Sequence, residues 1–379
     1  MSTLQLKCFK NDNVYPFEIN TFNDPSNSSY YSNLIVEGGY KVPWFRSLVP
    51  FKQLHITFWA QNTPLIENQK LSAIMWLERM FIKDESFNPY GTHKDRRSEF
   101  IVNYAIENDI DKIVCLTAWN AGYSLSRYCS RAQIDYTSLV FPWVSKERKK
   151  SLSEWANVLT IDGSKYRWIL RPRDWKQIIE EFDKFERRLL WKNIWAVTNS
   201  WEPLSMNAYK ELFYEVKDQK PDYIVLPCWS GDIIVGVWLA IKELGMDTKI
   251  IGVGPKDEHP LKYALEYWVE EFEITQSNGS KFSEEFEIKY KEPTLAEKLS
   301  STFSWVLPIL YHIFNEPGNI YVEVDNEEIG KTKKLLEDFG IKCEHSASVA
   351  FAAFFSHQRP DIDPSSKVII ISTGKGLEN

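Results

Sequence analysis

Paired cysteines, clustered histidines and long apolar runs are what this chain lacks. Its six histidines form no ligand cluster, which argues against a metal site. Its longest apolar run, residues 233–241, is far too short to span a membrane, and residues 1–20 are polar and mixed, without a signal pattern. The five cysteines contain no CxxC pair, so we expect reduced thiols in a soluble, cytoplasmic protein. They are Cys8, Cys115, Cys129, Cys228 and Cys343.

An excess of positive charge is also missing. The 379 residues include 45 basic and 52 acidic side chains, well interspersed, for a formal charge of −7. This balance argues against a dedicated nucleic-acid surface. A hydrophobic content of 44% and a charged content of 26% are ordinary for a globular protein. The length is enough for one large core or two medium ones.

The pattern that is present is an alternation of strands and helices. Residues 1–60 have weak periodicity and predict short strands and loops that wrap the main body. Beyond residue 110 the alternation predicts parallel sheets with crossover helices, and a ligand cleft at the strand ends between two βα blocks. Residues 270–292 are acidic and poorly periodic, which favours an exposed loop. The predicted strands are 74–77, 80–83, 112–116, 136–141, 158–161, 194–197, 223–227, 249–253 and 368–372, and the predicted helices are 121–132, 145–156, 175–188, 205–216, 233–244, 328–339 and 347–357.

One stretch, Asn88-Pro89-Tyr90-Gly91-Thr92-His93-Lys94, combines a rigid turn with a helix start. Asn88-Pro89 and Gly91 interrupt regular structure, and Thr92 suits the N-cap of a helix that begins near Lys94. A lysine held at a fixed position can form a Schiff base with a carbonyl cofactor. The alternative is a solvated basic helix start.

Three further loops follow apolar strands or open helices: 117–122, 229–232 and 372–376. Helix starts with small residues attract anions, because free N–H groups and the helix dipole point at one spot. Taken singly, Asn120 or Ser230-Gly231-Asp232 could simply cap a helix, and Thr373 could serve an ordinary turn. Together with Lys94, the loops would suit pyridoxal phosphate.

The order and spacing of these loops resemble the fold type II pyridoxal-phosphate enzymes, and most closely the threonine synthase branch. That family's lysine loop reads Asn-Pro-Thr-Gly-Ser-Phe-Lys-Asp-Arg, and this chain keeps the frame with Tyr90, Thr92 and His93 as variations. The resemblance covers roughly residues 60–379. It implies pyridoxal 5′-phosphate as cofactor, with Lys94 as the Schiff-base lysine and later the proton-transfer base.

The resemblance also assigns the other site residues. It implies that Asn120 binds the 3′-hydroxyl of the cofactor and that Thr373, in Thr373-Gly374-Lys375-Gly376-Leu377, lies near the pyridine nitrogen. The loop with Thr117, Ala118 and Trp119 would wrap the carboxylate of the substrate. The cofactor phosphate would be bound by the segment that contains Trp229, Ser230, Gly231, Asp232 and Ile233.

Departures from the family pattern concentrate in these loops. Trp119 stands where the family has glycine, so an indole fills space near the substrate carboxylate. Trp229 and Asp232 stand where the phosphate loop usually offers glycine, and Asp232 would repel a phosphate unless its carboxylate faces away or caps the helix. With only Cys8 in the N-terminal region, the chain cannot build the cysteine-bearing metal knot of some relatives.

The resemblance implies a PLP-dependent lyase or transferase that acts on an amino acid by β- or γ-elimination or replacement, threonine synthase-like with an altered substrate pocket. It also implies a homodimer, with no nucleic-acid or membrane partner. The alternative is a non-catalytic descendant that serves as a ligand sensor or partner-binding protein. The expected domains are a wrapping segment at 1–60, a large α/β domain at 61–110 and 191–379, and a small α/β domain at 111–190.

Overall fold

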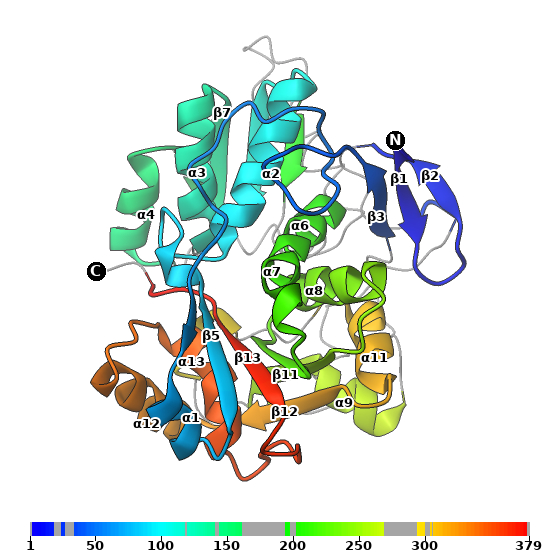
Figure 1. Ribbon diagram of the computed structural model, residues 1–379. Coiled ribbons are helices and arrows are strands. Elements are labelled where there is room, and N and C mark those ends of the chain that lie inside the picture. The colour runs from blue at the N-terminus through cyan, green and yellow to red at the C-terminus, as the bar shows by residue number, and fades with distance from the viewer. Residues whose placement is uncertain are drawn as a thin grey trace. The chain divides into compact units, whose positions relative to one another are not determined.

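The computed structural model describes residues 2–18, 24–26, 34–117, 120–140, 144–160, 194–197, 202–268, 294–299, 304 and 306–376 (Figure 1). The chain forms two compact units. Unit 1 draws on Met1–Phe58 and Lys94–Ala208, and unit 2 on Trp59–His93, Tyr209–Glu273 and Lys281–Asn379. The predicted helix at 175–188, the acidic stretch at 270–292, and the loop residues Ala118 and Trp119 lie outside the described residues.

Unit 2 is built on a sheet of six strands in the order β12-β11-β10-β13-β5-β4. The first five run parallel, and β4 pairs antiparallel with β5. The predicted strands at 80–83, 223–227, 249–253 and 368–372 are confirmed. The strands are β4 (Leu65–Glu67), β5 (Arg79–Asp84), β10 (Tyr223–Pro227), β11 (Lys249–Pro255), β12 (Ile320–Val324) and β13 (Lys367–Ser372).

Continuous apolar sequences explain why β10 and β13 lie inside this sheet. Both are buried along most of their length, as strands covered on two faces must be. Helices α12 (Asn326–Asp338) and α13 (His345–Ala352) contribute to a core that also contains Val225, Ile251 and Ile370. The other helices of unit 2 include α7 (Lys210–Val216), α8 (Asp232–Glu243), α9 (Pro260–Tyr267) and α11 (Leu307–Asn315).

Unit 1 contains two sheets. Four parallel strands follow the order β8-β7-β6-β9, and three antiparallel strands follow the order β2-β1-β3. The predicted α/β architecture with parallel sheets is confirmed in both units. The strands are β1 (Ser2–Cys8), β2 (Val14–Pro16), β3 (Leu34–Gly39), β6 (Lys112–Leu116), β7 (Asp135–Val140), β8 (Asn157–Thr160) and β9 (Ile194–Val197), and the helices include α2 (Lys94–Glu107), α3 (Asn120–Ala132), α4 (Lys146–Ser153) and α6 (Pro203–Ala208).

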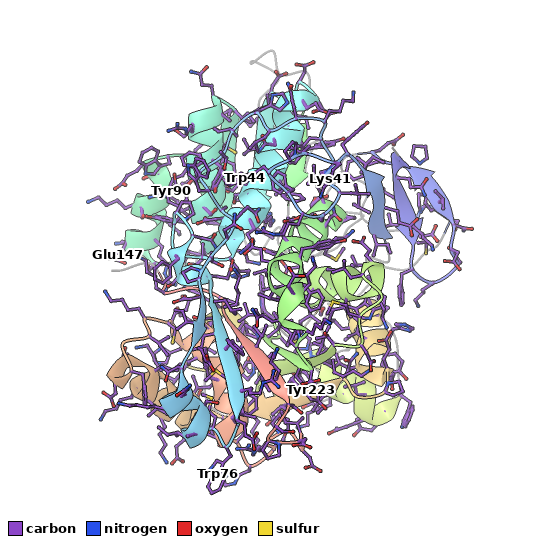
Figure 2. All side chains as sticks on the ribbon, viewed as in Figure 1. Lys41, Trp44, Trp76, Tyr90, Glu147 and Tyr223 are labelled. Atoms are coloured by element: carbon purple, nitrogen blue, oxygen red, sulfur yellow. The ribbon has the colours of Figure 1, made fainter. Side chains whose placement is uncertain are left out.

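Two predicted elements are wrong in detail. The strand predicted at 74–77 is the end of helix α1 (Gln69–Ile74) and a turn, because the Asn68 side chain caps that helix by accepting the N–H of Leu71. Trp76 sits in the turn with φ of 53° and projects away from the ribbon (Figure 2). The helix predicted at 205–216 is divided at Tyr209 into α6 and α7.

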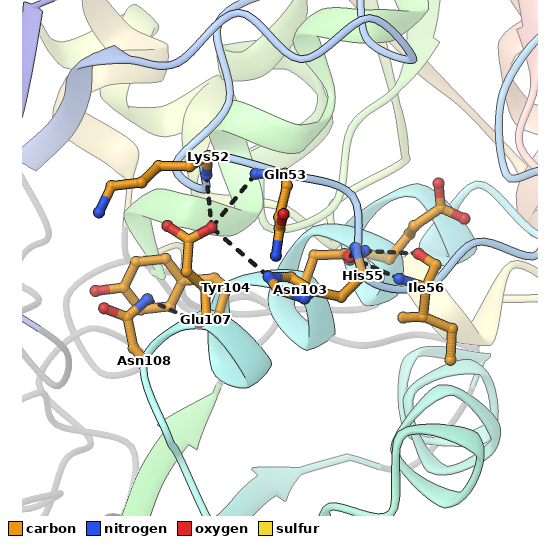
Figure 3. Close-up of polar contacts among 9 residues, drawn as sticks. Lys52, Gln53, His55, Ile56, Asn103, Tyr104, Glu107 and Asn108 are labelled. Atoms are coloured by element: carbon orange, nitrogen blue, oxygen red, sulfur yellow. Dashed lines mark hydrogen bonds and ion pairs between the residues drawn. The ribbon is translucent and has the colours of Figure 1, made fainter.

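A polar stripe on α2 binds an extended stretch of unit 1 (Figure 3). The stripe consists of Glu99, Asn103 and Glu107, which are four residues apart and therefore share one helix face. The carboxylate of Glu107 accepts the N–H of Lys52 at 2.6 Å. The Asn103 amide oxygen accepts those of His55 and Ile56 at 2.6 and 3.0 Å.

The stripe continues toward the start of α2. One carboxylate oxygen of Glu99 accepts the hydroxyl of Thr57 and the N–H of Phe58, both at 3.1 Å, and the other accepts the indole N–H of Trp44 at 3.2 Å. Residues 52–58 have no regular structure of their own. Side chains of α2 therefore satisfy backbone groups that would otherwise need a neighbouring strand.

Within the described residues, no helix is both long enough and apolar enough to cross a bilayer.

Candidate active site

Three of the loops predicted to bind the cofactor meet at one edge of the sheet in unit 2. Residues 85–93 follow β5, residues 228–231 follow β10, and residues 373–376 follow β13. Because β10, β13 and β5 are neighbouring parallel strands, their carboxyl ends lie at the same edge. This edge is the usual ligand position in open parallel sheets.

The lysine loop and the Thr373 loop are joined directly. Thr92 and Gly374 form an antiparallel bridge, the N–H of His93 donates to the Thr373 carbonyl at 2.9 Å, and the N–H of Lys375 donates to the Gly91 carbonyl at 3.1 Å. A side chain on Gly374 would place its Cβ 2.7 Å from the Gly91 carbonyl oxygen, so the close approach requires glycine there. The backbone immediately before Lys94 is therefore held by the chain that carries Thr373.

Two buried charged side chains, Lys83 and Glu85, form hydrogen bonds that hold the start of the lysine loop. The carboxylate of Glu85, which is fully buried, accepts the hydroxyl of Thr63 at 2.6 Å and the side-chain amide of Asn88 at 2.7 Å. The ammonium of Lys83 bonds the Thr63 carbonyl and the carboxylate of Glu215, each at 2.5 Å. Sequence reasoning missed Glu85; the available signal was a run of charges, Lys83-Asp84-Glu85, directly after an apolar strand.

Lys94 is the first residue of α2, as predicted, and only 7% of it is exposed. The chain passes from unit 2 to unit 1 between His93 and Lys94. Long charged side chains are seldom buried without a partner or a function. The burial of Lys94 therefore disagrees with the alternative of a solvated basic helix start.

Lys94 and Asn120 lie at the same end of two packed helices of unit 1. The helices α2 and α3 contact one another, and both lead into the starts of the paired strands β6 and β7, so they run in the same direction. Four residues into each helix, the hydroxyl of Ser124 donates to that of Ser98 at 2.7 Å, and Ser98 donates to the Lys94 carbonyl at 3.1 Å. The sequence had suggested both residues but not this serine connection.

In the predicted carboxylate-binding loop, Thr117 on one side is bonded to Gly122 on the other. Thr117 is buried, and its hydroxyl accepts the N–H of Gly122 at 3.0 Å. A Cβ on Gly122 would lie 2.2 Å from the Thr117 methyl group, so only glycine fits there. The structure therefore fixes both ends of the loop, at Thr117 and Asn120.

The start of α8 has the features of an anion site. Gly231 occupies the N-cap position with φ of 94°, and no side chain caps the helix. A Cβ on Gly231 would lie 2.6 Å from a Leu310 methyl group. Within the described residues, the N–H groups of Ser230, Gly231 and Ile233 donate to no other group. The residues therefore fit a phosphate, which takes such donors at helix starts.

Asp232 is buried in the first turn of α8, and its Oδ1 accepts the hydroxyl of Ser230 at 3.0 Å. This contact holds one carboxylate oxygen beside the Ser230 hydroxyl; the sequence had left open whether the carboxylate caps the helix or faces away from the phosphate. Trp229 is partly buried and packs against the core of unit 2. Its carbonyl oxygen contacts Nε2 of His259.

Thr373 is buried at the end of β13, where its carbonyl is bound by His93. Its neighbour Ser372 is fully buried, and its hydroxyl makes no hydrogen bond within the described chain. A buried hydroxyl without a partner is unusual in a folded protein. Sequence reasoning did not single out Ser372, although its place beside Thr373 was visible.

Comparison with known proteins agrees with this arrangement. The family model described as "Pyridoxal-phosphate dependent enzyme" matches residues 56–374. The threonine synthase of Methanocaldococcus jannaschii is 25% identical over 335 residues, covering 84% of this chain and 75% of the relative. The threonine synthase of a Synechocystis species is 23% identical over 337 residues, covering 86% and 78%.

A solved pyridoxal 5′-phosphate-dependent aspartate racemase shares the fold, with a TM-score of 0.66 at 16% identity, covering 83% of this chain and 91% of the racemase. The family match extends from before the lysine loop to residue 374 and so includes Lys94, Asn120, Ser230 and Thr373. The chain belongs to the pyridoxal-phosphate dependent enzymes of fold type II, and its cofactor is pyridoxal 5′-phosphate.

Proposed function

We propose that the protein acts on a small amino acid by β- or γ-elimination or replacement, with chemistry similar to that of threonine synthase. The observation that carries the proposal is the buried Lys94, which directly follows a loop bonded to the Thr373 segment at the edge where α8 begins. Pyridoxal phosphate, when bound, supplies an electron sink for negative charge that develops at the α-carbon of an amino acid.

Lys94 has two roles in this proposal. Its amine would hold the cofactor through the aldehyde carbon and would become free when an amino-acid substrate takes its place. The freed Nζ removes the proton from the substrate α-carbon and returns a proton later in the cycle. Loss of a β- or γ-substituent alone would be an elimination. Addition of water or another nucleophile to the substrate after that loss would make the reaction a replacement.

In this proposal the other loops bind and orient the cofactor and the substrate. The N–H groups of Ser230, Gly231 and Ile233, with those of Trp229 and Asp232 beside them, hold the phosphate. The Asn120 amide would bind the 3′-oxygen of the cofactor ring, and the Thr373 hydroxyl would bind the pyridine nitrogen. Thr117, Ala118 and Trp119 form the loop for the substrate carboxylate, where Trp119 narrows the choice of substrate.

We further propose a homodimer in the cytoplasm, with domain boundaries at 1–60, 61–110 with 191–379, and 111–190. Light scattering after size-exclusion chromatography tests the dimer, and limited proteolysis tests the boundaries.

The central test compares two lysine variants. Purified wild-type protein should absorb in the visible region typical of a lysine-bound cofactor, and borohydride reduction followed by peptide mass spectrometry should find the cofactor on Lys94. Lys94→Ala should lose both signals, and the rate of turnover should fall at least about a thousandfold, because one group performs attachment and proton transfer. Lys375→Ala, which changes an exposed lysine in the paired loop, serves as the control and should retain both.

The substrate is sought by titration with amino acids and their O-phospho and O-acetyl forms. Release of phosphate, acetate or ammonia identifies the leaving group, and an added nucleophile in the product identifies a replacement. Covalent cofactor on Lys94 without turnover of any of these compounds would contradict the proposal and favour the ligand-sensor alternative.

A further inference from the structure

We propose that His259, together with Ser304, is a positioning residue that directs the N–H groups at the start of α8 toward the cofactor phosphate. The inference rests on the proposed assignment of residues 229–233 to that phosphate. His259 lies in the turn between β11 and α9, and Ser304 lies just before α11, so neither belongs to the loop that they position. Both residues are completely buried.

The hydrogen bonds of His259 identify its tautomer. Nδ1 accepts the N–H of Leu261 at 3.1 Å and caps helix α9. A nitrogen that accepts a hydrogen bond carries no proton, so the proton of the neutral ring is on Nε2. Nε2 faces the carbonyl oxygen of Trp229, and the ring therefore donates to that carbonyl.

The environment keeps the ring neutral. Burial lowers the pKa of His259 to about 4, although the bond to Trp229 acts in the opposite direction. The Cys228 sulfur lies 3.9 Å from Nε2, and burial raises the pKa of that thiol well above its usual range, so it carries no charge. The single N–H of the ring is thus available to Trp229 throughout the physiological pH range.

Fixing a carbonyl also fixes the next N–H. A planar trans peptide directs its N–H away from its carbonyl, and the described backbone has no cis peptides. With the Trp229 carbonyl bound by His259, the N–H of Ser230 points away from His259. The hydroxyl of Ser304 donates to the Ser230 carbonyl at 2.8 Å, and the N–H of Gly231 accordingly points away from Ser304.

The result is a loop in which buried side chains bind the Trp229 and Ser230 carbonyls, while within the described residues the N–H groups of Ser230 and Gly231 remain available. The N–H of Cys228 donates to the Val253 carbonyl at 2.6 Å and holds the loop at its other end. Without the two side-chain donors, a rotated peptide would present a carbonyl oxygen to the phosphate, and the two would repel each other. His259 and Ser304 thus fix two successive peptides of a loop that carries Trp229 where the family pattern has glycine.

The test separates helix capping from loop positioning. Asn is a good N-cap residue and can still accept the Leu261 N–H, but its side chain is too short to reach the Trp229 carbonyl. Gln places a donor near the position of Nε2. We therefore compare His259→Asn with His259→Gln, and use Ser304→Ala as an independent variant that removes the second donor.

The measured quantity is the ratio of dissociation constants of the apoprotein for pyridoxal and for pyridoxal phosphate, obtained by titration without any substrate. Because the two ligands differ only in the phosphate group, the dissociation constant for pyridoxal divided by that for pyridoxal phosphate measures how much the phosphate contributes to binding. His259→Asn and Ser304→Ala should each lower it about tenfold, which corresponds to one hydrogen bond to a charged group. His259→Gln should recover most of the loss, and the ³¹P resonance of the bound cofactor should move back toward its wild-type position.

An unchanged ratio in both His259→Asn and Ser304→Ala, or equal weakening of the two ligands, would overturn the inference and leave the residues with a structural role only. If His259→Asn does not fold, Ser304→Ala decides alone. Because no amino-acid substrate is present, an enzyme that turns over nothing can still show the predicted ratio, so failure of the proposed reaction and failure of this inference are distinguishable.

Discussion

At the scale of single residues, burial rather than residue type decides what a side chain does. Glu202 precedes α6 and is 4% exposed. One carboxylate oxygen accepts the N–H of Leu204 at 3.2 Å, and within the described residues the other has no hydrogen-bond partner. Burial raises the pKa of Glu202 to about 7, although Leu204 and the nearby Arg97 lower it. The sequence offers no sign of this, because a lone glutamate before a proline looks exposed.

Glu202 should make the stability of the protein depend on pH. Its folded-state pKa exceeds the ordinary value of 4.5, so the folded state binds more protons than the unfolded state between these values, and stability falls as pH rises from about 4.5 to about 7. Glu202→Gln keeps the acceptor for Leu204 but carries no charge. We expect its free energy of unfolding to exceed that of the wild type by less than about 1 kcal/mol at pH 5 and by about 3 kcal/mol at pH 8.

Urea denaturation at the two pH values checks this expectation. Glu147→Gln is the matched control, because Glu147 is exposed on α4 (Figure 2). The difference in free energy of unfolding between this variant and the wild type should be the same at pH 5 and pH 8. A Glu202→Gln variant less stable than wild type at pH 8 would show that the carboxylate is needed in its charged form.

For the residues of the site, too, the sequence reveals some roles and not others. Lys94 and Asn120 could be predicted as helix starts from sequence, because turn residues and apolar strands flank them. Ser98, His259 and Ser304 could not, since each bonds a residue distant in the chain. Their assigned partners are defined by tertiary packing, about which local patterns carry no information.

At the scale of elements, long apolar strands were predicted well and short or polar-capped elements poorly. The strands β6 and β10 have the predicted bounds, because their apolar runs are short, rich in β-branched residues and flanked by polar or turn residues. Helix α1 was predicted as a strand because its apolar residues are consecutive, and the Asn68 cap overrides that pattern. The helices α9 and α11 were missed, and the polar stripe of α2 was not recognised as a binding face.

The α2 stripe should contribute strongly to the stability of unit 1. The Asn103 amide oxygen accepts two backbone N–H groups, while its Nδ2 donates to the Ile56 and Glu99 carbonyls, both at 2.8 Å. Asn103→Ala removes the partner of the part-buried N–H groups of His55 and Ile56 and of the Ile56 carbonyl, so we expect a loss of about 3 kcal/mol in the free energy of unfolding. Denaturant melts measure the loss.

Asn108→Ala is the control for Asn103→Ala (Figure 3). Asn108 is exposed in the turn directly after α2, and its side chain donates to the Tyr104 carbonyl. Its replacement should change the free energy of unfolding by less than about 1 kcal/mol. Equal effects of the two variants would mean that the bonds of Asn103 to residues 55 and 56 contribute little.

At the scale of the whole molecule, the fold class was predictable and the strand order was not. Alternating strands and helices indicate parallel sheets, which both units contain. The order β12-β11-β10-β13-β5-β4 places the latest strand in the chain beside one of the earliest. Apolar periodicity indicates that a strand is buried, but it does not identify the neighbouring strands.

This order makes the sheet of unit 2 depend on β13. We expect deletion of residues 367–372 to abolish cooperative unfolding of unit 2, because β10 and β5 both lose their common neighbour. Hydrogen exchange followed by mass spectrometry should show loss of protection in β5 and β10, with β6 and β7 of unit 1 as the internal control. Retained protection in β10 would contradict a central role for β13.

The position of β13 also has a consequence for the growing chain on the ribosome. β5 emerges nearly 300 residues before the strand that pairs with it, and during that interval β5 and β10 each present an unpaired apolar edge. Such edges bind other chains readily, and contacts so distant in sequence form slowly. We therefore expect chaperones to bind nascent unit 2. The yield of folded unit 2 on expression should depend on chaperones more than the yield of folded unit 1 does.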